Sequence, residues 1–449
     1  MSATPEALAA RRYVTVCALL WLPSGLGLAP LIPLLTERGM SLAAIAGFFA
    51  AHSLTAAALE LPTGGLSDVL GRRAVLASAG VLNVVALVMV GLGTTAWVLT
   101  VGLVLKGAGR ALASGPAEAW YVDTVQTHAG PGADLRTGLA RGSTATSAVL
   151  AGGILLGGAL PWLLGLGPDL GDRLSEVTSR IVPPLAVPLL LGAMVEVVFV
   201  GYVLAALREP PRPPAGPGSL LRGIRGTVAA GLRLGSRDAL VRRILLSAGA
   251  VGGALGALEL LSPDRAVALT GGSESGAVLY AALACAGFVC AGAGSHLAPF
   301  AARAAGSGER AVLAGLAAGA VGLLLLGVTA GAAQPLAMTL AVVGFCLVYL
   351  GLGVAGPSEN ELLHHRVPSA GRATALSFQS LALQLVAAVT GLIVGALRPG
   401  PLPWLLAAAV LLSGTLLWLR RPTTDTAQRP SSEEPGAPRP SVHRVRGSG

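Results

Sequence analysis

The sequence predicts an all-α membrane protein with twelve transmembrane helices in two six-helix lobes, and three observations lead to that fold class. Hydrophobic residues make up 53% of the 449 residues, charged residues only 12%, and the mean hydropathy is +0.72. A water-soluble domain could not bury that much apolar surface. The chain also divides into twelve mostly apolar stretches, each near the roughly 20 residues that cross a bilayer core of about 30 Å. A repeated segment, described below, divides these stretches into two sets of six.

The expected spans follow one another with short polar connections. They cover residues 12–35, 41–67, 73–92, 97–122, 138–164, 183–206, 242–261, 274–296, 310–330, 335–356, 373–397 and 402–419. The 62 glycines fit such spans, because small residues let membrane helices approach closely. Most tryptophans fall near expected span ends, as in an interfacial belt, whereas Trp21 lies inside the first span.

The basic residues predict the orientation. If the N-terminus is cytoplasmic, most of the 31 Lys and Arg residues fall on the cytoplasmic side. The opposite side then carries only Arg38, Arg173, Arg180, Arg265 and Arg398. By the positive-inside rule we expect a multi-pass protein of the plasma (cell inner) membrane with both termini in the cytoplasm. The net charge of +9 follows from this topology and from contact with membrane lipids, so we expect no nucleic-acid partner.

The organisation of the chain follows from one interruption and one repeat. Residues 208–241 begin with the proline-rich run EPPRPP and continue from Ser219 as an amphipathic pattern. We therefore expect an N-terminal six-helix lobe (1–207), a cytoplasmic linker with an amphipathic helix (208–241), a C-terminal six-helix lobe (242–419) and a disordered cytoplasmic tail (420–449). The run GRRAVLA, from Gly71, returns 237 positions later as GERAVLA, which indicates duplication of a six-span unit.

The loop after the second expected span carries a family signature. Its sequence, GGLSDVLGRR from Gly64 to Arg73, resembles the major facilitator superfamily pattern Gly-x-Leu-Ala-Asp-Arg-x-Gly-Arg-Arg, with departures at Val69 and Ser67. The resemblance implies two lobes around a central cavity, alternating access, and a cytoplasmic latch between the lobes. The latch would be formed by Gly64, Asp68, Gly71, Arg72 and Arg73, with Asp123 as the acid partner. The alternative is that Arg72 and Arg73 only determine topology.

A second resemblance concerns the end of the second span and the fourth span. The runs ELPTG, from Glu60, and SGPAEA, from Ser114, resemble a bacterial exporter branch of the same superfamily. These two runs favour an exporter.

The second half of the chain has Ala305 at the position that corresponds to Asp68, so any latch is asymmetric.

Charged residues inside expected spans are the candidates for proton coupling. An intramembrane carboxylate is costly and marks a functional site with a partner to be found. Glu60 in the second span and Arg110 in the fourth lie at comparable depth, so we expect them to pair, as a coupling site or as a purely structural ion pair. Glu259, in the seventh span, is a further coupling candidate. Glu196 and His52 are buried polar groups without an assigned role.

The solute is expected at mid-depth between the lobes, near Trp21, Lys106 and Arg110. Lys106 and Arg110 lie one helical turn apart and favour an anionic or zwitterionic group, and the ring of Trp21 could stack on the solute. Core packing is an equal alternative for Trp21. A structural role is the alternative for Lys106.

The function predicted from these features is secondary active transport of a small organic solute, with proton-coupled efflux favoured and proton-coupled import as the alternative. A polytopic membrane enzyme is a remote third possibility, because only Glu359, Glu361, His364 and His365 approach a clustered site, and they fit a charged helix end better. No catalytic triad, phosphate-binding loop or metal-ligand spacing is present. We therefore expect no enzymatic activity, no cofactor and no metal, with protons and the solute as partners of a monomer.

Overall fold

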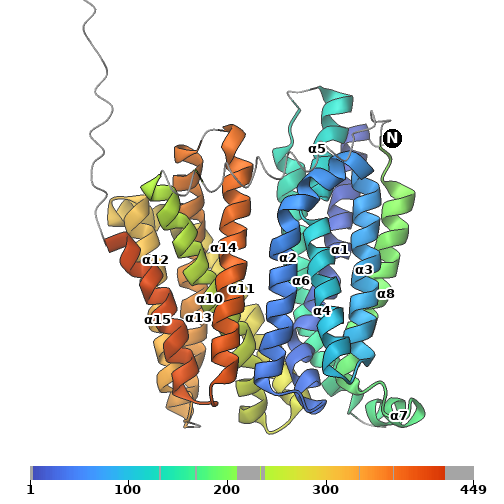
Figure 1. Cartoon of the computed structure of the whole chain (residues 1–449), viewed down its shortest axis with the longest axis vertical. Helices are drawn as coiled ribbons and strands as arrows, with labels where there is room; N and C mark the ends of the chain where they lie inside the picture. The colour runs from blue at the N-terminus through green and yellow to red at the C-terminus, as the bar shows by residue number, and fades with distance from the viewer. Residues whose placement is uncertain are drawn as a thin grey trace, which may run out of the picture.

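The structure is a bundle of long helices in two lobes (Figure 1). This computed structural model describes residues 4–130, 133–166, 169–209, 233, 238–332, 334–367 and 369–419, without the side chains of residues 61–65, 68, 69, 172 and 369–373. Within these residues the regular elements are all helical, and twelve spans are long and apolar enough to cross a membrane. The predicted fold class is confirmed.

The N-terminal lobe contains the first six spans and lies at the right of Figure 1. Its elements are α1 (Pro5–Glu37), α2 (Leu42–Leu70), α3 (Arg72–Leu92), α4 (Ala96–Ala113), α5 (Pro116–Ala129), α6 (Arg136–Leu164), α7 (Leu170–Val177), a 3-10 turn (Pro184–Ala186) and α8 (Val187–Ala206). The short helix α7 lies in the connection before α8 and was not expected from the sequence. We call the side of the molecule where α1 begins and α15 ends the terminal side, and the side where α7 lies the far side.

The C-terminal lobe contains the other six spans. Its helices are α10 (Ala239–Thr270), α11 (Ser273–Ala305), α12 (Gly308–Val328), α13 (Pro335–Arg366), α14 (Ser369–Ala396) and α15 (Pro401–Leu419). Helix α10 begins at Ala239 because the Asp238 carboxylate accepts hydrogen bonds from the backbone N–H groups of Leu240 (2.9 Å) and Val241 (3.2 Å), as an N-cap does. Residues 210–232, 234–237 and 420–449 lie outside the described residues, so the linker, its amphipathic helix and the tail stay predictions.

The fourth span differs from the single helix expected over residues 97–122. It is divided into α4 and α5 at Ser114-Gly115-Pro116. Gly115 has φ +90°, a conformation that side chains with a Cβ rarely adopt, and Pro116 has no N–H to continue the ladder of α4. The break therefore follows from the two residues themselves.

The two lobes pack together on the far half of the molecule. Helix α2 contacts α14, α6 contacts α11, and α1 contacts α10 and α11. Gly158 of α6 lies so close to α11 that an added Cβ would be 2.5 Å from Cβ of Ala281 and 2.7 Å from the carbonyl oxygen of Ala277. At the other inter-lobe seam, a Cβ on Gly395 of α14 would lie 2.6 Å from Cβ of Ala46 on α2. Small residues thus let the lobes approach here.

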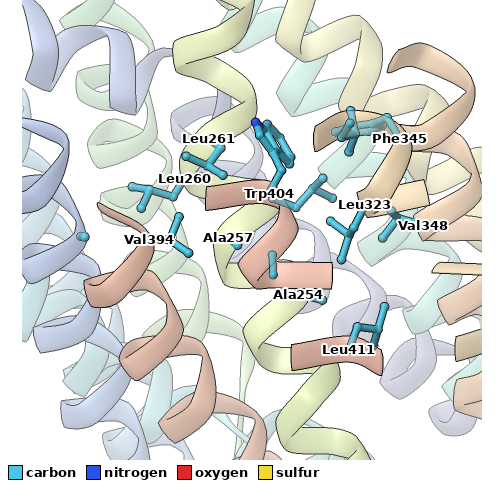
Figure 2. Packing of buried hydrophobic residues seen from close by; sticks show 14 of the residues in the cluster. Ala254, Ala257, Leu260, Leu261, Leu323, Phe345, Val348, Val394, Trp404 and Leu411 are labelled. Atoms are coloured by element: carbon cyan, nitrogen blue, oxygen red, sulfur yellow. The ribbon is translucent and has the colours of Figure 1, made fainter. Parts of the chain in front are cut away.

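The largest hydrophobic cluster extends from the C-terminal lobe into the far half of α1 and α2. Figure 2 shows part of its C-terminal portion, with Trp404 of α15 among Leu323 of α12, Phe345 of α13 and Leu261 of α10. Trp404 is only 4% exposed, and Leu323 is fully buried. The cluster is continuous across the lobes, so the structure is closed on its far side.

Two arginines on the far side show that the lobes are built alike. Arg38, just after α1, donates to the carbonyl oxygens of Val90 (2.6 Å) and Gly91 at the end of α3. Arg265, on α10, donates to the carbonyl oxygens at the end of α12, those of Leu326 (3.0 Å) and Thr329 (2.7 Å). A cation at the C-terminus of a helix satisfies its free carbonyl groups and its dipole. The first span of each lobe therefore caps the third span of the same lobe.

Candidate functional site between the lobes

Glu60 contacts the opposite lobe. Its Oε2 atom accepts hydrogen bonds from Oγ of Ser380 (3.0 Å) and from Nε2 of Gln384 (3.0 Å), both on α14. Nε2 of Gln384 also lies 3.3 Å from Oγ of Ser380. The carboxylate of α2 is thus held by two donors of the other lobe. We call Glu60, Ser380 and Gln384 the α2–α14 clasp.

The expected pair of Glu60 and Arg110 stays a prediction. The positive charge of Arg110 acts on the carboxylate of Glu259 on α10, in the other lobe. The charge of Glu259 also acts on Tyr280 of α11 and Tyr349 of α13. The hydrogen bonds described for the Glu60 carboxylate lead to α14.

Arg110 and Glu259 both remain exposed although they lie within spans. They come from opposite lobes and carry opposite charges. Such a pair forms an electrostatic link across the interface, and its strength depends on how close the lobes lie. It is the arrangement expected of groups that face a space between the lobes.

Trp21 lies on the face of α1 that is turned toward the C-terminal lobe. It is 38% exposed. Leu28, seven residues or about two turns further along α1, packs against a cluster that includes Tyr280 and Ala281 of α11. Trp21 therefore shares the inter-lobe face of α1, but no contact in the described residues assigns it a role.

The charge of Lys106 acts on a different carboxylate from the charge of Arg110. The carboxylate on which its charge acts is Glu196 of α8, which is fully buried inside the N-terminal lobe. A place for the solute beside Lys106 stays a prediction.

The loop between α2 and α3 ties α3 to its own lobe. The Arg72 guanidinium forms an ion pair with Asp123 of α5 and donates to the carbonyl oxygen of Ala119. Arg73 donates through its side chain to the carbonyl oxygen of Leu204 on α8. The expected Arg72–Asp123 contact is present, whereas closure of the two lobes by this loop stays a prediction. Gly64 lies in α2, and the side chain of Asp68 lies outside the described part of the structure.

Gly71 is required by two features of this loop. Its φ is +90°, and an added Cβ would lie 2.6 Å from Oε2 of Glu209. Oε1 of the same carboxylate accepts from the backbone N–H of Arg73 at 2.7 Å, at the start of α3. Glu209 thus supplies a carboxylate to a helix N-terminus, where negative charge is stabilising. The sequence analysis had placed Glu209 in the linker without a role.

Comparison with known proteins identifies the family. The sequence profile of the Major Facilitator Superfamily matches residues 15–391. The chain belongs to the Major Facilitator Superfamily. No curated protein matches it. Family and fold together indicate a multi-pass transporter of small solutes rather than an enzyme.

Solved structures with this fold include transporters of several kinds. The nucleoside transporter NupG is 13% identical with a TM-score of 0.70, over 92% of this chain and 98% of that one. A bacterial homologue of the human lysosomal transporter Spinster, inward-facing and unoccupied, is 15% identical with a TM-score of 0.67, over 93% and 96%. A D-xylose–proton symporter is 16% identical with a TM-score of 0.64, over 91% and 97%. At these identities the likeness concerns the fold alone.

This superfamily member also carries a repeat that the sequence analysis missed. Gly115-Pro116-Ala117-Glu118 in the fourth span returns as Gly356-Pro357-Ser358-Glu359 in the tenth. Glu118 is exposed, whereas Glu359 is 3% exposed and accepts a hydrogen bond from Ser247 of α10. A search for repeated short motifs at offsets other than that of the loop would have found it.

The described part of the chain contains no group of three or more His, Cys, Asp or Glu placed to hold a metal ion. Its four cysteines are free, and Cys17 is buried. The chemistry available between the lobes is therefore that of carboxylates, one guanidinium and hydroxyl groups.

Proposed function

We propose that this protein moves a small organic solute across the plasma membrane by alternating access, coupled to protons, with export as the direction. The observation that carries the proposal is the Arg110–Glu259 pair, whose members come from opposite lobes. In this proposal both termini lie in the cytoplasm and the transporter acts as a monomer. The solute binds near Trp21, Lys106 and Arg110 and carries an anionic or zwitterionic group.

Proton coupling follows from the chemistry of the pair. An ionised Glu259 attracts Arg110 and favours the arrangement in which the lobes approach at this level. A proton on Glu259 removes the negative charge, so that the attraction is lost and Arg110 is free for an anionic group of the solute. In a poorly solvated site each of these changes has a larger effect than in water. Proton binding and lobe movement are thereby linked.

The α2–α14 clasp supplies a second link between charge and lobe arrangement. Ionised Glu60 accepts from Ser380 and Gln384 across the interface. Hydrogen bonds to a charged group contribute about 1.5–3 kcal/mol each. Protonation of Glu60 would weaken both bonds at once.

Import is the second candidate. A D-xylose–proton symporter shares the fold, and an inter-lobe carboxylate serves either direction. Export is preferred because the ELPTG and SGPAEA runs resemble an exporter branch. The direction of transport depends on how the solute and the proton bind. If they exclude each other the solute is exported, and if they bind together it is imported.

The test uses the full chain in proteoliposomes with an imposed proton gradient and a panel of small anionic, zwitterionic and neutral compounds. We expect gradient-driven movement of at least one compound, opposite to the proton flow. Glu259→Gln should abolish gradient-driven movement but leave exchange of the compound without a gradient. Glu361→Gln, at an exposed carboxylate on the terminal side, is the matched control. Wild-type coupling in Glu259→Gln would contradict the proposal, and movement along the proton flow would favour import.

A further inference from the structure

Glu196 is a buried carboxylate that the proposed transport cycle does not use. It lies on α8 with no exposed surface, and its Oε1 atom accepts one hydrogen bond, from Nδ2 of Asn83 on α3 (3.0 Å). Its Oε2 atom is buried and has no hydrogen-bond partner among the described residues. An ionised carboxylate with an unsatisfied oxygen inside a membrane protein is strongly unfavourable. The site requires another donor.

Asn83 has the same deficit. It is 5% exposed, and its Oδ1 atom also has no partner among the described residues. Helix α4 closes over it, since a Cβ on Gly109 would lie 2.5 Å from that oxygen. Glu196 and Asn83 are thus hydrogen-bonded to each other, and each has a second oxygen that lacks a donor among the described residues.

Lys106 lies three residues before Gly109 on α4, so it shares the helix face that meets Asn83, and its charge acts on Glu196. Of the helices packed against α8, α3 contributes the neutral Asn83, and within the described chain neither α1 nor α6 presents a charge that acts on Glu196. Lys106 donates no hydrogen bond to any residue that the structure describes and is half-buried. An ammonium group has three donors on a flexible stem.

We propose that Glu196, Asn83 and Lys106 form a proton-binding site inside the N-terminal lobe, where a proton and the Lys106 ammonium alternate at Glu196. In one state a proton from water binds Oε2 of Glu196, the carboxyl group is neutral, and Lys106 stays apart. In the other state the proton returns to water and Lys106 donates to the carboxylate and to Oδ1 of Asn83. The net charge of the cluster changes by one between the states, so one proton is bound or released.

This site is separate from the Arg110–Glu259 pair and does not rest on the direction or coupling proposed above. Its three members belong to one lobe, so rocking of the lobes does not separate them. It gives the chain a second site that can bind a proton. When Glu196 is deprotonated, Lys106 is bound to it.

Infrared difference spectroscopy of the purified full chain between about pH 8 and about pH 5 tests the proposal, since this range lies above the ordinary pKa of exposed carboxyl groups. The wild type should gain a C=O band of a protonated carboxyl group on acidification. Glu196→Gln should lose the part of that band that comes from Glu196, while the other buried carboxyl groups keep theirs. Glu359→Gln, at a buried carboxylate of the other lobe, should keep it. Identical wild-type and Glu196→Gln spectra would overturn the proposal.

Substitution of Lys106 tests whether its ammonium group competes with the proton at Glu196. Burial of Glu196 alone would not depend on Lys106. In Lys106→Met no cation competes with the proton, so the Glu196 band should persist to higher pH than in the wild type. Lys106→Arg keeps the positive charge. In this variant the Glu196 band should disappear at the same pH as in the wild type or at a lower pH. If the band disappeared at the same pH in Lys106→Met and in the wild type, Lys106 would not take part.

Discussion

At the residue scale, the described carboxylates inside the spans differ in the hydrogen-bond donors within their reach. Glu60 has two donors on another helix, Glu359 has the Ser247 hydroxyl, and Glu196 has one amide and one oxygen without a partner. A carboxylate that is fully satisfied is held in one arrangement. One that lacks a donor is where a proton or a moving cation is expected.

Gly71 gives a prediction at this scale. Gly71→Ala should destabilise the folded protein by about 1–3 kcal/mol from the positive φ alone, and by more because its Cβ would meet Glu209. Gly130→Ala is the matched control, because Gly130 has φ +83° with nothing within 4 Å of an added Cβ. Thermal unfolding in detergent measures both. Equal losses would show that the Glu209 contact does not constrain Gly71.

At the element scale, the helices are tied together differently within a lobe and between lobes. The loop arginines connect α3 to α5 and α8 in one lobe, and Arg38 and Arg265 connect first and third spans in both. The α2–α14 clasp connects the two lobes. Ties within a lobe make it a rigid unit, so movement is expected to concentrate where α2 meets α14.

The clasp predicts a difference between two glutamines of α14. Gln384→Leu removes a donor to Glu60, so it should reduce gradient-driven transport strongly. Glu60→Gln should abolish gradient-driven transport. Both variants should still insert into the membrane. Gln379→Leu is the matched control, because Gln379 is on the same helix and makes no hydrogen bond among the described residues. Solute uptake into proteoliposomes is the measurement. Equal transport in the two leucine variants would mean that the clasp is only structural.

The Arg72–Asp123 pair predicts a change in access to the terminal side. Asp123→Asn leaves Arg72 without its carboxylate, so α5 is held less firmly in the position against which the C-terminal lobe would close. In a chain without native cysteines, labelling of Glu118→Cys from the terminal side should therefore increase. Asp134→Asn, at an exposed acid that bonds only locally to Thr137 (2.6 Å) and the N–H of Arg136 (3.0 Å), should leave labelling unchanged. Unchanged labelling in Asp123→Asn would count against the latch.

At the scale of the whole molecule, far-side closure depends on residues without side chains. The approach of α6 to α11 leaves no room for a Cβ at Gly158. Two rigid lobes that meet at such points can respond to added bulk by rotating apart as units.

Gly158→Val should therefore shift the protein toward a state that is open on the far side. The matched control is Gly152→Val on the same helix, where nothing lies within 4 Å of an added Cβ. Distances between spin labels on the far ends of α6 and α11 measure the populations, and a bias of about 1.4 kcal/mol changes their ratio tenfold. Unchanged distances in Gly158→Val would show that this contact does not hold the far side closed.

The sequence by itself determined the membrane class, the twelve spans and the six-plus-six organisation, because the length of the apolar stretches and the repeat are local properties of the chain. It also indicated the Arg72–Asp123 contact, since both residues belong to a loop pattern with a nearby acid. The break at Gly115 was readable in principle, from a glycine and a proline in succession.

Only the tertiary structure decided which charges meet. Depth along a helix can be counted from the sequence, but the direction of a side chain depends on how the helix is rotated against its neighbours. Glu60 therefore meets Ser380 and Gln384, some 320 positions away, while the charge of Arg110 acts on Glu259 and that of Lys106 acts on Glu196. Glu209 likewise reaches Arg73 because α8 ends beside the start of α3. These contacts arise from packing across the chain, and no local pattern specifies them.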